Sequence, residues 1–489
     1  MARSSTAANS ALPAQQKFDI DIAENNDKNQ RKVSKTLTPA QLEKYLRFAL
    51  ADVTPKGRWK RMLAVMIWGS PGVGKTDVIR QLAEKRGARL VALHLPQYDP
   101  TDVKGIVVRL SDDTIKWMPS SYLPGYVKHS RVFFSDPYDV AFRFPYSENL
   151  DFRVTQSGKN ITDEFTIDVF DPTNSARISP KTGAKIDFGT SCTVELFERA
   201  ILFLDEISAA DIEVQKAALQ LVLDRRVGEY DLPPTCPVVA AGNMEQDGAF
   251  TNPMSGPLSN RFNHVKLVHS LTEWISYEIN SGRANPETIA FLTNYGSAYL
   301  HRYESSELTD GNNGFATPRS WSFLAEQLNA VEDFGNEFSV DDQETLIIGQ
   351  IGATVGTAFI GFRSVRNKLP DLEAIFRNED VAIHRDFDLP SQYMIAIMLA
   401  LKMGKDIYPV EWDSDANGGR GRGTERWDTA REGFFKFITK NLPNDIQYLA
   451  VSMMQSKMGV QGSALICEGF KKYATAIMPL QKNVHSSHR

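Results

Sequence analysis

Residues 69–76 read Gly69, Ser70, Pro71, Gly72, Val73, Gly74, Lys75 and Thr76, which matches the phosphate-binding pattern G-x-x-x-x-G-K-[ST]. The loop follows the apolar run 64–68, which predicts a buried strand, and precedes residues 77–83, whose apolar side chains recur at helical spacing. Its glycines would let backbone N–H groups surround phosphates at a helix N-terminus. Lys75 would contact the outer phosphates, and the Thr76 hydroxyl would bind Mg²⁺. This strand–loop–helix context favours nucleotide binding over a glycine turn that binds nothing.

The composition indicates a globular protein of two to four domains. Of the 489 residues, 42% are apolar and 24% are charged, and the net charge of −5 disfavours nucleic acid as the partner. Cys192, Cys236 and Cys467 are too far apart to predict a disulfide framework or a zinc site, so a reducing cytoplasm is the simplest location. The polar N-terminus does not resemble a signal peptide, and the longest apolar stretch, 347–362, contains glycines, so we expect no membrane span.

A second signature lies at residues 200–206. Five apolar residues precede Asp205 and Glu206, which predicts a strand in the middle of a parallel sheet with both acids at its carboxyl end, where such sheets bind ligands. Asp205 would hold Mg²⁺, and Glu206 would deprotonate the attacking water. Asn243, after the predicted strand 238–241, would contact the γ-phosphate and that water. The alternatives are two solvated acids that cap the next helix and an asparagine that caps a loop.

Two arginines complete the candidate site. Arg261 lies just before the predicted strand 265–268, away from the loop of its own chain, so it would be useful at the nucleotide of a neighbouring copy. Arg319 follows Pro318 in the first turn of a predicted helix, from which it would reach over the nucleotide. For a single arginine the alternative is a surface salt bridge.

The chain is expected to be α/β, with a three-layer αβα nucleotide-binding core, a β-rich insertion and a helical remainder. Alternating apolar residues and Gly or Asn turns predict the insertion at about 125–188. The expected parts are a disordered arm at 1–35, the core at 36–270, a helical lid at 271–380 and a helical C-terminal extension at 381–489. Thr38 and Pro39 predict the start of a helix, residues 224–230 suggest a hairpin, and helical patterns continue through 346–362. By composition, the stretch 413–424 is a flexible loop.

Other chemistries find less support. Asp102 to Gly105 spells the D-x-x-G of a small GTPase, but Asn367-Lys368 is followed by Leu369-Pro370, so the guanine-reading N-K-x-D motif is not formed. The eight histidines show no paired metal-ligand spacing, and no G-x-S-x-G motif occurs, so we assign the histidines to the core or the surface.

The order of these motifs resembles that of AAA+ ATPases, and more narrowly that of the MoxR branch, including variants in bacterial and bacteriophage genomes. The matching stretches are 69–76, 99–105, 204–208 with 214–226, 260–262 and 316–319. The resemblance implies catalytic roles for Lys75, Glu206, Asn243 as first sensor, Arg261 as finger and Arg319 as second sensor. Gly242-Asn243-Met244 stands where the branch usually has Asn-Pro, and Asn260 where an Asp usually precedes the finger.

The resemblance further implies a ring, usually a hexamer, that hydrolyses ATP with Mg²⁺ between subunits and remodels or activates a protein client. Such ATPases often work with a von Willebrand factor A-type partner, and this one would act in the cytoplasm of a bacterium or of a phage host. Two alternatives stay open. One is a nucleic-acid motor or loader, and the other is a switch that binds nucleotide without turnover.

Overall fold

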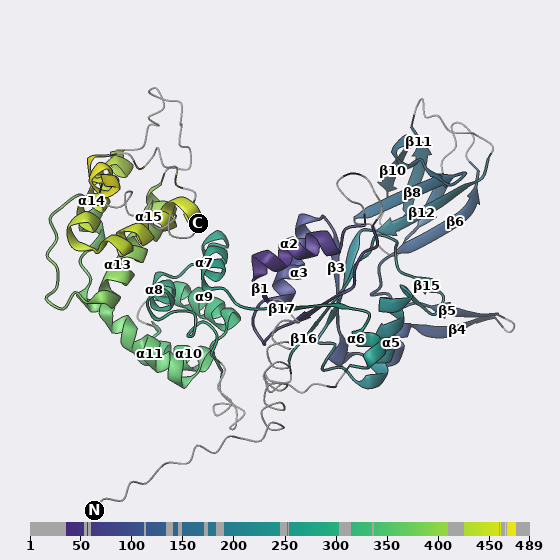
Figure 1. Ribbon diagram of the computed structural model, residues 1–489, viewed down its shortest axis with the longest axis horizontal. Coiled ribbons are helices and arrows are strands. Elements are labelled where there is room, and N and C mark those ends of the chain that lie inside the picture. The colour runs from purple at the N-terminus through teal and green to yellow at the C-terminus, as the bar shows by residue number, and fades with distance from the viewer. Residues whose placement is uncertain are drawn as a thin grey trace, which may run out of the picture. The chain divides into compact units, whose positions relative to one another are not determined.

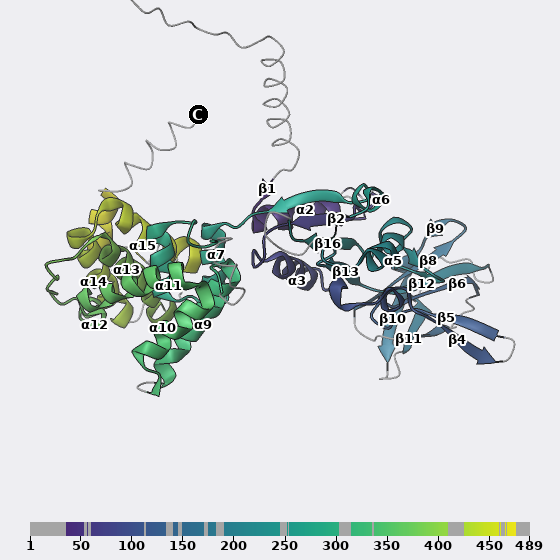
Figure 2. The ribbon, with the colours of Figure 1, turned by 90° about the horizontal axis from the view of Figure 1, so that it is seen from below.

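The computed structural model has two compact units, one comprising residues 1–70 and 75–268 and the other residues 71–74 and 269–489 (Figures 1 and 2). The expected arm at 1–35 and the expected loop at 413–424 lie outside the described residues. The structure describes residues 36–475 except 53–55, 57–59, 112–113, 134–139, 145–148, 171–174, 182–189, 245–251, 253, 303–313, 335–336, 409–424, 459, 461–464 and 466.

A six-stranded sheet forms the centre of the first unit, in the order β1-β17-β2-β16-β13-β3. All neighbouring strands in it are parallel. The strands are β1 (Thr36–Leu37), β2 (Val65–Trp68), β3 (Arg89–His94), β13 (Ala200–Asp205), β16 (Val238–Gly242) and β17 (Asn263–Leu267). Parallel strands place all their carboxyl ends at one edge, where ligands bind in open α/β sheets.

Helices cover both faces of this sheet. On β13, Leu202 and Leu204 share a core with Val214 of α5 (Ile212–Leu223), whereas the alternate residue Phe203 points to the opposite face and is also buried. The helix α3 (Lys75–Lys85) packs on β3 and β13 and contacts α2 (Pro39–Ala49), which begins after the predicted Thr38-Pro39 cap (Figure 1). The shorter helices are α4 (Pro100–Lys104) and α6 (Gly256–Ser259). The predicted αβα fold is confirmed.

The β-rich insertion consists of two antiparallel sheets, β6-β12-β8-β9 and β10-β11-β7. Phe142, Val154, Phe165, Ile178 and Leu196 belong to the core that these sheets share. Its strands are β6 (Tyr126–Val132), β7 (Val140–Arg143), β8 (Leu150–Gln156), β9 (Lys159–Asn160), β10 (Phe165–Phe170), β11 (Ser175–Pro180) and β12 (Cys192–Glu198). Because β12 is paired along its length with β6 and β8, these antiparallel sheets continue to residue 198, beyond the predicted end at about 188.

Two hairpins extend the first unit. The predicted turn after α5 forms β14 (Arg226–Val227) and β15 (Tyr230–Asp231). A hairpin that the sequence patterns did not predict, β4 (Ile106–Ser111) with β5 (Thr114–Met118), projects beside it (Figure 1). The Trp117 indole N–H donates to the Lys104 carbonyl at 2.9 Å, and a Cβ at Gly228 would lie 2.6 Å from Trp117 Nε1. Close packing at Gly228 therefore joins the two hairpins.

The second unit is helical, as predicted. A single hydrophobic core runs from Trp274 through Phe291 and Trp321 to Phe434, so helices on both sides of residue 380 share it. The predicted helical stretch 346–362 is divided at Gly352, whose φ of 83° ends one helix before the next begins. The helices are α7 (Leu271–Asn280), α8 (Pro286–Tyr295), α9 (Pro318–Phe334), α10 (Val340–Ile351), α11 (Ala353–Arg363), α12 (Leu372–Phe376), α13 (Leu389–Lys402), α14 (Glu425–Asn441) and α15 (Asn444–Met458). None of the helices in the described ranges has the length and hydropathy required to cross a bilayer.

Candidate nucleotide site

Three neighbouring strands of the central sheet end at the candidate site. The phosphate-binding loop follows β2, Asn243 follows β16, and Asp205 is the last residue of β13. The register pairs Gly242 with Trp68 and Leu204 with Ala240, so the three strand ends lie side by side. Residues that are far apart in the sequence therefore come together because adjacent parallel strands end at a common edge.

The Lys75 side chain donates hydrogen bonds to neighbouring groups of this site. Only 8% of the residue is exposed, and its ammonium donates to the carbonyl oxygens of Gly69 (2.6 Å) and Ser70 (3.2 Å) and to Asn243 Oδ1 (2.8 Å). These acceptors are neutral, and a phosphate oxygen, which is charged, is a stronger acceptor for an ammonium group. The lysine is therefore held at the loop by contacts that a bound triphosphate can replace.

The two residues predicted to bind Mg²⁺ are in direct contact. Thr76 Oγ1 donates to Asp205 Oδ2 at 3.1 Å. A hydroxyl and a carboxylate are hard oxygen ligands, and Mg²⁺ at nucleotide sites commonly takes only one or two protein ligands besides phosphate and water. The described residues contain no cluster of three or more His, Cys, Asp or Glu side chains that would bind a metal by itself. The donor set thus fits Mg²⁺ that arrives with a nucleotide.

Glu206 lies just beyond the end of β13 in an unusual backbone conformation. Its φ is 54°, in the left-handed region that L-residues rarely adopt, and its N–H donates to Asp205 Oδ1 at 3.1 Å. Such strain costs of the order of 1 kcal/mol or more and is concentrated at functional sites. The Glu206 side chain is 38% exposed, so water can reach its carboxylate.

A histidine that the sequence analysis assigned to the core or surface belongs to this site. His94 Nε2 lies 3.4 Å from Glu206 Oε2, and His94 Nδ1 lies 4.0 Å from Asp205 Oδ2. His94 is the last residue of β3, and the register pairs it directly with Asp205. The sequence signal for this role was the position of His94 at the end of the strand before the insertion. That signal was not sufficient, because β3 pairs with β13 across more than a hundred residues of sequence.

The backbone of Asn243 is held by Ser208. The Asn243 N–H donates to Ser208 Oγ at 3.2 Å, and Ser208 Oγ lies 3.4 Å from the Asn243 carbonyl. The neighbouring Gly242 leaves no room for a side chain, because a Cβ there would lie 2.7 Å from both Ser208 Oγ and Met66 Cε. Glycine therefore permits the close contact between β16 and the loop after β13.

We expect Gly242→Ala to destabilise the first unit by roughly 1–3 kcal/mol, because the added methyl group overpacks a buried strand. It should also reduce turnover, since displacement of Ser208 would move Asn243. Gly256→Ala is the matched control, because a Cβ at Gly256 has no neighbour within 4 Å. Urea denaturation and phosphate release would be measured for both variants. Equal stability and turnover of the two would contradict this account.

The two arginines differ in their relation to this site. The Arg319 N–H donates to the carbonyl oxygen of Gly72, in the phosphate-binding loop, at 3.3 Å, whereas Arg261 makes no contact of this kind with that loop in the described residues. Arg261 precedes β17, and Asn263 pairs with Val65 at the start of β2, so Arg261 lies at the amino edge of the sheet. The phosphate-binding loop begins after Trp68 at the opposite edge, roughly 10 Å away along β2 alone at about 3.3 Å per residue. Arg319 belongs to the second unit, in the first turn of α9 as predicted. Asp102, from the D-x-x-G sequence, caps α4 by accepting the Asp99 N–H at 2.9 Å.

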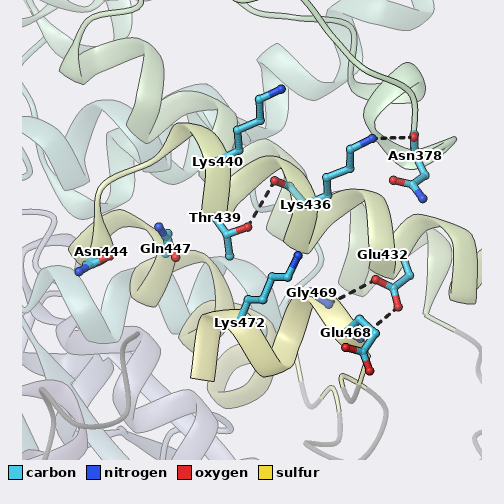
Figure 3. Close-up of a pocket in the computed structure, with 10 residues that line it drawn as sticks. All are labelled: Asn378, Glu432, Lys436, Thr439, Lys440, Asn444, Gln447, Glu468, Gly469 and Lys472. Carbon is cyan, nitrogen blue, oxygen red and sulfur yellow. Dashed lines mark hydrogen bonds between the residues drawn. The ribbon is translucent and has the colours of Figure 1, made fainter. Parts of the chain in front are cut away.

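A hollow of about 600 Å³ lies in the second unit, between α14, α15 and residues 468–472 (Figure 3). Most of its charged groups have structural partners. Lys436 pairs with Asp380 at 3.2 Å, and the Glu432 carboxylate accepts the backbone N–H groups of Glu468 and Gly469 at 3.2 and 3.4 Å. These contacts join helices, so we do not assign this hollow to the nucleotide chemistry.

The sequence matches no protein-family model and no curated protein. Among solved structures, NtrX from Brucella abortus is 12% identical, with a TM-score of 0.28, and the match covers 65% of this chain and 56% of that one. NtrX in complex with ADP is 14% identical, with a TM-score of 0.31 and coverage of 91% and 74%. A candidate ATPase from Cytophaga hutchinsonii is 12% identical, with a TM-score of 0.25 and coverage of 89% and 86%. These scores are too low to support an inference, so the chemistry of the site is inferred from its own residues.

Proposed function

We propose that this protein is an AAA+ ATPase of the MoxR type, which hydrolyses ATP between adjacent copies in a ring and uses the motion to remodel a protein client. The observation that supports it most is the contact of Lys75 with Asn243, and of Thr76 with Asp205, at one edge of a parallel sheet. Each pair joins a residue of the phosphate-binding loop or its helix to the end of another strand. Glu206 lies beside them with a carboxylate that water can reach.

Each residue then has one task in the reaction. The loop N–H groups and Lys75 would bind the phosphates, while Thr76 and Asp205 would hold the magnesium ion, which neutralises phosphate charge. Glu206 would accept a proton from the attacking water, and Asn243 would orient that water. The oxygen of the water forms a bond to the γ-phosphorus as the bond to the β,γ-bridging oxygen breaks, which releases ADP and phosphate. Arg319 would act as the second sensor.

The position of Arg261 supports hydrolysis between copies. Its guanidinium lies at the amino edge of the sheet, whereas the loop of the same chain lies at the carboxyl edge. An adjacent copy that turns its amino edge toward the site would supply the arginine missing from that site. A hexameric ring would meet this requirement, and a von Willebrand factor A-type protein is a candidate partner for client activation.

The test of nucleotide turnover compares the wild-type chain with Lys75→Ala. We expect wild-type protein to bind ATP with magnesium and release phosphate, and Lys75→Ala to lose both because the phosphates lose their buried cation. Lys85→Ala is the matched control, since that lysine ends the same helix and pairs with Glu43 at 2.9 Å. Phosphate release by Lys75→Ala at the wild-type rate would refute the proposal.

A further inference from the structure

A pocket of the first unit lies at the edge of the central sheet opposite the nucleotide site. It measures about 540 Å³, and its lining includes residues that directly precede β2 and β17 and the first residue of β16. Its walls include the apolar side chains of Leu223 and Phe262. Its charged lining is mainly basic, with Lys60, Arg61, Arg225 and Arg261 against a single acid, Asp52. This charge imbalance suits an anionic ligand.

Two of these four cations have structural roles. The Arg225 guanidinium donates to the carbonyl oxygens of Pro233 (2.7 Å) and Cys236 (2.5 Å), which holds the turn after α5. Lys60 donates to the carbonyl oxygens of Phe48, Ala49 and Ala51 at 2.9, 3.3 and 3.3 Å, which caps the end of α2. Neither side chain needs a ligand to explain its position.

Arg61 and Arg261 have no such role. Both are exposed, and in the described ranges neither guanidinium makes a hydrogen bond or an ion pair with another residue. Both line the same pocket, and the segments that carry them meet where the Asn263 N–H donates to the Ala64 carbonyl at 2.8 Å. Like charges that line one pocket repel each other, which favours an anion as the ligand of that pocket.

We propose that Arg61 is a second arginine that acts in trans, and that it binds, together with Arg261, the triphosphate held by an adjacent copy of this chain. The inference rests on the proposed function, in which the amino edge of one copy faces the nucleotide site of the next. A planar guanidinium can contact two phosphate oxygens at once, and two such groups can share the charge that spreads over the oxygens during transfer. The apolar side chains of Leu223 and Phe262 would limit access of water to these contacts.

The test compares Arg61→Ala and Arg61→Lys with Arg226→Ala, all assayed as full-length chains. Arg226 is the matched control, since it is an exposed arginine of the same unit that pairs with Asp231 at 3.6 Å. We expect Arg61→Ala to lower kcat by about tenfold or more, with the KM for ATP within about twofold, because the nucleotide site of each copy stays intact. Arg61→Lys should recover part of the rate, and Arg226→Ala should behave as wild type.

Mixed assemblies show whether Arg61 acts in trans. Arg61→Ala chains keep their nucleotide site and Lys75→Ala chains keep both arginines, so a mixture should hydrolyse ATP faster than either variant alone. Normal turnover of Arg61→Ala, or no recovery in the mixture, would overturn the inference. The parallel mixture of Arg261→Ala with Lys75→Ala separates the two hypotheses. If turnover recovers in the Arg261→Ala mixture and not in the Arg61→Ala mixture, only the role of Arg61 is rejected. If turnover recovers in neither mixture, hydrolysis in trans is itself rejected.

Discussion

The variant Glu206→Gln is expected to bind ATP as tightly as the wild type and to lose its turnover almost completely. Glutamine has the same size and keeps one acceptor oxygen, so contacts around residue 206 remain, but an amide does not accept a proton from water. The loss of a positioned base costs roughly 10²–10⁴-fold in rate. Binding should persist because Lys75, Thr76 and Asp205 are unchanged and make their contacts independently of Glu206.

Phosphate release at saturating ATP measures the turnover of Glu206→Gln, and a fluorescent ATP analogue measures its affinity. Glu213→Gln is a suitable control, because Glu213 is an exposed acid of the first unit that pairs with Lys216 at 2.6 Å. Its turnover should match that of the wild type. If Glu206→Gln hydrolyses ATP at a normal rate, another group takes the proton, and His94, at 3.4 Å from Glu206, would be the first residue to examine.

Local sequence patterns predicted the helices, strands and turns that a few consecutive residues are sufficient to indicate. The apolar run before Asp205 forms β13, which is buried on both faces. Thr38 and Pro39 begin α2. The turn after α5 forms the short hairpin β14–β15. In each case a few consecutive residues determine the element, through hydrophobic periodicity, a helix cap or a turn. The same patterns predicted that the phosphate-binding loop, Asp205 and Asn243 lie at one edge of the sheet, because the carboxyl ends of parallel strands meet at the same edge.

Features that depend on distant pairing were not predicted. The strand β12 lies outside the predicted insertion because only its pairing with β6 and β8 shows that it belongs there. His94 joins the site through the register of β3 with β13, and its own neighbours in sequence give no sign of this. The hairpin β4–β5 begins with Ile106 and Val107, both of which are 57% exposed. Because apolar residues are usually assigned to the core, the sequence did not indicate that these two begin a projecting strand.

The variant Arg261→Ala should bind ATP normally and hydrolyse it about a thousandfold more slowly, if the guanidinium stabilises the transition state at the site of the next copy. Its own site is unaffected, because Arg261 lies at the opposite edge of the sheet. Lys75→Ala has the complementary defect, with an empty site and an intact arginine. When equal amounts assemble at random, about a quarter of head-to-tail interfaces combine an intact site with an intact arginine.

Turnover of the mixture should therefore approach about a quarter of the wild-type rate, although each variant alone is inactive. Phosphate release is measured after the two proteins are mixed at concentrations where wild-type chains associate, and sedimentation verifies that association. Arg80→Ala mixed with Lys75→Ala serves as control, because Arg80 pairs with Asp77 of the same helix at 2.5 Å and should add no rescue beyond its own activity. An inactive mixture of Arg261→Ala with Lys75→Ala in verified assemblies, or brisk turnover by an isolated monomer, would show that the arginine is not supplied by a neighbour.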